Sequence, residues 1–145
     1  IHSLFTVPQI SVRLAEVPKS HVDMIRRYIT FWREHRDVLL DGAIRPLQPQ
    51  HSYPAIVAET DAKVAGAAFA DGFVPLPNIG NRTLLLANGT MFDRIVIELP
   101  DGLGERRVRV WSCTGELVLD ETRDFSAGPQ TIQVPPAGTA VIAKA

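Results

Sequence analysis

The stretch RIVIELPDGLGERRVRVW, residues 94–111, is the most informative about the fold of this chain. Every second residue of segment 94–99 is Ile or Leu, and valines alternate with arginines in segment 107–110. A period of two residues is typical of a β-strand that buries one face. Segment 100–104 lies between these two strands and contains Pro, Asp and two Gly, so we expect it to close a hairpin.

The same signals recur from residue 43 to the end of the chain. Short apolar or alternating runs are separated by turn residues, and no helical period lies between them. The sequence therefore predicts a mainly β fold, an antiparallel β-sandwich of about eight strands, over residues 42–145. Prolines in segment 73–81 make it a loop or an edge strand. The expected strands cover residues 44–47, 53–59, 63–70, 82–87, 94–99, 106–113, 116–119, 131–134 and 139–143.

Before Gly42 the pattern is helical. One long α-helix is expected over about residues 20–40, with Ser20 as its N-cap and Gly42 at its C-terminal cap. Its apolar residues cover about half of the circumference, whereas a surface helix usually has an apolar stripe a little over 100° wide. Such a helix is suited to contact two bodies. The β-strands supply one, and we expect the other to lie outside this sequence.

Four residues of this helix are candidates for contact with that second body: Phe31, Trp32, Arg36 and Leu39. Arg36 falls within the apolar stripe, where a buried guanidinium would need a carboxylate or carbonyl partner. Two interpretations of Arg36 stay open. It pins the helix to a neighbouring domain, or its stem packs while its charged head reaches solvent.

The composition excludes several classes of function. Fifteen Lys and Arg residues balance 16 Asp and Glu, so the basic surface that nucleic-acid binding requires is not expected. No apolar run approaches the roughly 20 residues that cross a bilayer, and we expect no membrane association. Cys113 is the single cysteine, so no internal disulfide forms. The absence of a signal peptide and of disulfides weakly favours the cytoplasm.

No catalytic motif is present in the sequence. The four histidines do not fall at metal-ligand spacings, and there is no nucleophile elbow or phosphate-binding loop. Carboxylates such as Asp120, Glu121 and Asp124 occupy positions that solvation and turn formation explain. We therefore predict no catalytic residue, no metal and no cofactor in this chain.

Aromatic residues are the remaining candidates for ligand contact, because sugar rings stack on flat side chains. Trp111 is the first choice in the β-segment, with Tyr53 and Phe73 next. The alternation places Trp111 on the same face as Arg107 and Arg109, where it is either partly exposed and available to a sugar or covers the sheet or the helix.

The helical segment resembles the closing helix of melibiase-type α-galactosidases. The resemblance covers roughly residues 4–54. The run that carries most of it is FWREHRDVLLDG, residues 31–42. The other matching residues are LFTVPQISV at 4–12, Leu14, Val17-Pro18, His21, Arg45-Pro46-Leu47 and Tyr53-Pro54, with a faint similarity at LLLANG, residues 84–89.

In that family a (β/α)₈ barrel is followed by a small C-terminal β-domain, and retaining hydrolysis of α-galactosides takes place on barrel aspartates. The resemblance thus implies that residues 1–41 are the end of such a barrel and residues 42–145 a domain that braces it. The implied partners are the upstream barrel and, through the parent enzyme, a galactoside. No motif of the catalytic aspartates occurs here. Two alternatives stay open: an independent carbohydrate-binding module and a self-associating structural domain.

Overall fold

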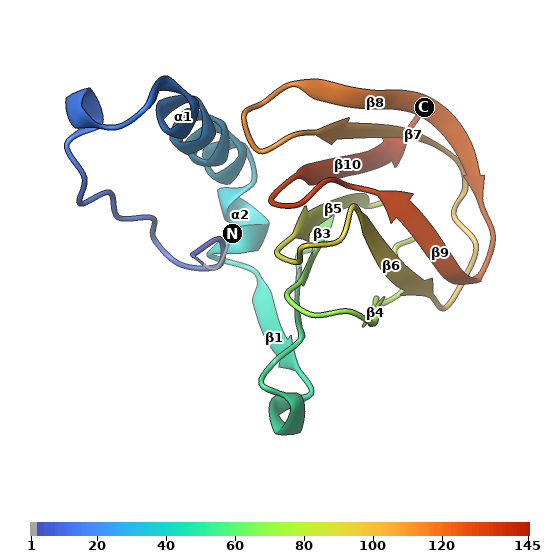
Figure 1. The fold of residues 1–145 in the computed structure, drawn as a ribbon. Coiled ribbons are helices and arrows are strands. Elements are labelled where there is room, and N and C mark those ends of the chain that lie inside the picture. Colours follow the sequence, from blue (N-terminus) through green and yellow to red (C-terminus); the bar gives the residue numbers. More distant parts are fainter. Residues whose placement is uncertain (1–2) are drawn as a thin grey trace.

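The computed structural model describes residues 3–145 (Figure 1). Ten strands in this range form two sheets, one of seven strands in the order β1-β2-β3-β5-β10-β7-β8 and one of three in the order β4-β6-β9. The strands are β1 Ala43–Leu47, β2 Ala55–Glu59, β3 Lys63–Ala68, β4 Phe73–Pro75, β5 Thr83–Asn88, β6 Arg94–Leu99, β7 Gly104–Trp111, β8 Leu117–Phe125, β9 Gly128–Gln133 and β10 Thr139–Lys144.

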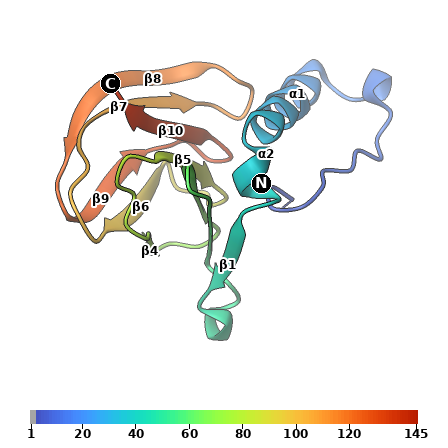
Figure 2. The same ribbon diagram turned by 180° about the vertical axis from the view of Figure 1, so that it is seen from behind.

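Helices α1 (Lys19–Glu34) and α2 (Arg36–Leu39) pack on the side of the seven-stranded sheet opposite the three-stranded sheet. Two short 3₁₀ turns, η1 (Leu14–Glu16) and η2 (Pro49–His51), interrupt the loops. In both views, segment 6–18 runs along the side of α1 that faces away from the sheets (Figure 2), whereas Leu4 is buried in the core beneath the helices. The layers are therefore helix, large sheet and small sheet.

The large sheet is the middle layer, and its central strands are buried on both faces. In β5, Leu84 and Leu86 belong to the core shared with the small sheet, whereas Leu85 and Ala87 belong to the core beneath the helices. Strands β3 and β10 divide their residues between the same two cores. The helices and the strands therefore fold as one body around this sheet.

The predicted mainly β fold with one leading helix is confirmed. Two strand pairs differ from the expected antiparallel pattern, because β3 pairs with β5 and β4 with β6 in parallel. Parallel strands that are buried on both faces have continuous apolar sequences instead of alternating ones. Strands β3 and β5 are of this kind. Segment 73–81 contributes an edge strand, β4, which is one of its two predicted states.

The hairpin predicted at residues 100–104 is wrong. Strand β6 lies in the small sheet and β7 in the large one, so this segment crosses from one sheet to the other. Strand β8 is also longer than the predicted 116–119. It is an edge strand with most side chains exposed, and without a buried face it shows no alternation in sequence.

The expected single helix over residues 20–40 is broken at His35. The backbone there has φ −125° and ψ 18°, outside the helical region. Pro18, not Ser20, occupies the N-cap position and makes no side-chain cap. Gly42 lies so close to the preceding turn that a Cβ would come within 2.6 Å of the Val38 carbonyl oxygen. The second helix, α2, begins at Arg36 after this break, and its Val38 and Leu39 are buried.

Asn88, at the end of β5, links the two sheets. Its side chain is fully buried and donates to the carbonyl oxygens of Phe92 and Val134, each at 2.7 Å. Its Oδ1 accepts from the backbone N–H of Thr90 at 3.0 Å and from the Thr90 hydroxyl at 2.7 Å. One amide therefore satisfies the backbone where the chain passes from the large sheet to the small one.

We predict that Asn88→Ala lowers the free energy of unfolding by about 3 kcal/mol, because buried backbone groups lose their partners. Urea unfolding monitored by circular dichroism measures this change. Asn81→Ala is the control, since Asn81 is exposed and should change stability by less than about 0.5 kcal/mol. Equal effects of the two substitutions would contradict the role given to Asn88.

Candidate interdomain surface

The inner face of α1 is fixed to the large sheet. Phe31 is buried in the core beneath the helices. Arg27 donates to the Thr139 hydroxyl at 2.8 Å, and the Tyr28 hydroxyl donates to the Ala137 carbonyl oxygen. At the other end Lys63 of β3 pairs with Asp37 at 2.8 Å. These contacts leave the opposite face of α1 uncovered by either sheet.

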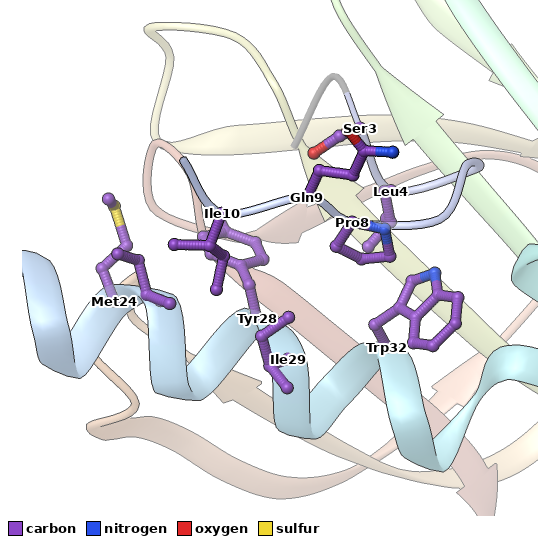
Figure 3. A pocket seen from close by; sticks show the side chains of 10 residues that line it. Ser3, Leu4, Pro8, Gln9, Ile10, Met24, Tyr28, Ile29 and Trp32 are labelled. Carbon is purple, nitrogen blue, oxygen red and sulfur yellow. The ribbon is translucent and has the colours of Figure 1, made fainter. Parts of the chain in front are cut away.

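That opposite face carries apolar side chains too. Met24, Ile25, Ile29 and Trp32 are each only partly buried. Segment 3–18 passes over them and leaves a groove of about 180 Å³ (Figure 3). Pro8 and Ile10 of the segment line this groove opposite the helix. The segment thus covers the helix only in part.

Segment 3–18 also presents apolar side chains to solvent. Val7 is 60% exposed and Leu14 47%, and Ile10 and Val12 are exposed as well. The indole Nε1 of Trp32 is buried without a hydrogen-bond partner among residues 3–145. We call the partly buried apolar face of α1 together with these side chains the outer surface. Within residues 3–145, Val7, Ile10, Val12 and Leu14 are the largest set of exposed apolar residues that lie close together in sequence.

The structure corrects the predicted contact residues. Phe31 and Leu39 are 1% and 0% exposed and lie in the core beneath the helices, so they contact this chain's own sheet. Leu39 belongs to the short helix α2, which begins after the break at His35. Trp32 lines the groove of the outer surface and also packs against the core beneath the helices.

The position of Arg36 agrees with the interpretation in which its stem packs and its charged head reaches solvent. Its side chain is 58% exposed, 3.8 Å from Asp41, and its guanidinium lies 5.8 Å from the centre of the Trp32 ring. The stem therefore packs beside Trp32 while the charged group remains in solvent. It is available to a partner but does not require one.

Trp111, the predicted sugar contact, lies beneath α1. Guanidinium carbons of Arg27 and Arg109 lie 4.7 and 5.5 Å from its ring centre, and it packs against the core beneath the helices. Its ring already stacks with cations from the helix and from its own strand. The arrangement matches the alternative in which Trp111 covers the sheet and the helix.

Within residues 3–145, no group of three His, Cys, Asp or Glu residues is placed to hold a metal ion. Asp120 forms an ordinary ion pair with Arg107 at 2.8 Å. Arg106, in the basic run, is buried and donates to the Gly80 carbonyl oxygen. None of the helices in the described range is long and apolar enough to cross a membrane.

His35, at the break between the helices, is partly buried and its ring meets the Phe31 ring edge-on at 4.8 Å. Burial, and then the charge of Lys63, lower the pKa of His35 below its usual value, although Glu34 and Asp37 act in the opposite direction. The folded protein therefore binds fewer protons at this position than the unfolded chain does near pH 6.

We predict that stability contributed by His35 is present above pH 6.5 and is lost as the pH falls below this value, where the unfolded chain takes up the proton. Urea unfolding at pH 7 and pH 5 tests this against His35→Gln, which cannot titrate. The variant should show a smaller decrease in stability over this interval. An identical decrease in both proteins would contradict the prediction.

No family model, no curated protein and no solved structure matches this chain. The geometry of the outer surface and the resemblance of the helical segment are therefore the basis for a functional proposal.

Proposed function

We propose that this chain is the C-terminal accessory domain of an α-galactosidase-like glycoside hydrolase, which packs its outer surface against an upstream catalytic barrel. The observation that carries the proposal is the two-sided burial pattern of α1. Phe31 faces the sheet, whereas Ile25, Ile29 and Trp32 lie partly uncovered on the other side. The segment with this pattern is the one that resembles the closing helix of that family.

Burial of the apolar side chains of the outer surface would lower the free energy of the folded protein. Full burial of a Leu, Ile or Met side chain contributes about 1.5–3 kcal/mol relative to full exposure. Monomeric proteins seldom expose large contiguous apolar surfaces unless these mediate an interaction. A second body that covers Val7, Ile10, Val12 and Leu14 would remove their apolar side chains from water.

The contribution of the domain to catalysis is indirect in this proposal. A retaining glycosidase needs two carboxyl groups about 5–5.5 Å apart that face the scissile bond. The family's catalytic aspartate motifs do not occur in this sequence, so the barrel supplies both groups. The β-domain holds the barrel's last helix in place, and the chain alone hydrolyses no galactoside.

A self-associating structural domain is the second candidate, and the same surface favours it. Two copies could cover each other's outer surfaces. The two candidates differ in what a full-length polypeptide would do, because a barrel that occupies this surface prevents its use for self-association.

We predict that Ile29→Asp destabilises the full-length polypeptide more than it destabilises this chain alone. The difference should be about 2 kcal/mol, because only the longer protein buries this position fully. Differential scanning calorimetry of both lengths measures it. Thr30→Asp is the matched control, since Thr30 is exposed one residue away on α1.

Three results would decide between the candidates. A larger effect in the long protein, with Thr30→Asp near neutral, supports the docked barrel. Equal effects at both lengths would contradict it. A full-length protein that dimerises, with dimers lost in Ile29→Asp, would assign the surface to self-association.

A further inference from the structure

A second cavity lies far from the outer surface, where the loop between β1 and β2 approaches strand β4. Its volume is about 450 Å³, within the range of about 300–1,000 Å³ for small-molecule sites. Residues from three separate parts of the chain meet there: the loop at 48–54, the segment 70–75 and Glu98 of β6. The proposed contact of α1 with a barrel does not use it.

One side of this cavity is apolar and aromatic. Phe73, Val74, Pro75 and Pro54 line it, and Phe73 is 61% exposed. Phe73 lies at the start of an edge strand, where a polar residue would be the ordinary choice. A flat apolar ring beside a cavity is suited to stack against the C–H face of a ligand.

The other side of the cavity carries polar groups of several kinds. Gln48 offers an amide, His51 an imidazole, and Asp71 and Glu98 offer carboxylates. All four side chains are exposed, so their hydrogen-bonding groups are accessible. Asp71 is 3.8 Å from Arg94, which partly offsets its charge. No Lys or Arg lines the cavity.

The loop that brings Gln48 and His51 to the cavity is held in an unusual conformation. Gln48, Ser52 and Tyr53 have φ of 49°, 60° and 56°, in the left-handed region that non-glycine residues seldom occupy. The Gln48 carbonyl oxygen accepts from the backbone N–H of His51 at 2.9 Å and of Tyr53 at 3.4 Å. Tyr53 is 50% exposed on the same loop but is not among the residues that line the cavity.

We propose that this cavity binds a neutral pyranose sugar, with Phe73 against the apolar face of the ring and Gln48, His51, Asp71 and Glu98 at its hydroxyl groups. A sugar ring matches both walls, since it has a C–H face and hydroxyls that donate and accept. A phosphate or other anion does not, because the cavity has carboxylates and no cationic side chain. The site is distinct from Trp111, whose ring is already stacked.

The test is an NMR titration of ¹⁵N-labelled protein with methyl α-galactopyranoside and methyl α-glucopyranoside. At least one sugar should give saturable shifts in residues 48–54 and 70–75, with a Kd on the order of 1 mM. Phe73→Ala should weaken binding about tenfold, and Phe73→Leu, which keeps an apolar side chain without the flat ring, should weaken it as well. Leu117→Ala is the control, since Leu117 is another exposed apolar residue and lies on β8, at the edge of the other sheet.

Each other outcome would overturn the proposal. Absence of shifts with both sugars at about ten times that Kd would exclude a pyranose site. Shifts that persist unchanged in Phe73→Ala would place binding elsewhere. A parallel titration with tetramethylammonium identifies an organic-cation site instead, if it gives shifts that Glu98→Gln removes while the sugars give none. Sugar binding is measured away from α1, so its failure leaves the Ile29→Asp comparison unaffected.

Discussion

The burial of the large sheet on both faces is the constraint on which the rest of the structure depends. Strands β3, β5 and β10 place alternate side chains in two different cores, so each face needs its own covering layer. The small sheet covers one face and the helices cover the other. This requirement explains the small side chains of β3, where Ala65, Gly66 and Ala67 let both layers approach closely. It also explains why helix and strands form one body.

The covering helix then has an uncovered side of its own. Helix α1 carries apolar residues on two faces, and segment 3–18 only partly covers the outer one. The proposed barrel contact follows from this shortfall. The proposed sugar site lies elsewhere, where the β1–β2 loop meets the edge strand β4. None of its lining residues belongs to α1 or α2.

Sequence periodicity predicted most strands because most have one clearly buried face, as Ile95, Ile97 and Leu99 do. It failed where the physical signal is absent. The crossing at residues 100–104 has the same turn residues as a hairpin, and only the sheet order separates the two. The inward placement of Phe31 and Leu39, and the position of Trp111 beneath α1, depend on contacts between segments far apart in the sequence. Among the aromatic candidates for sugar contact, the sequence placed Trp111 first, whereas Phe73 and Tyr53 are the ones with exposed side chains.

The most direct test of the central claim is the mass of the native polypeptide, measured by immunoblot of the cells that make it with an antibody raised against this chain. A (β/α)₈ barrel alone needs about 250 residues, so the account predicts a band several times larger than 15.9 kDa. Such a band would make hydrolysis of α-galactosides by that protein the next assay. A single band at 15.9 kDa would contradict the account, because no barrel would then exist to cover the outer surface.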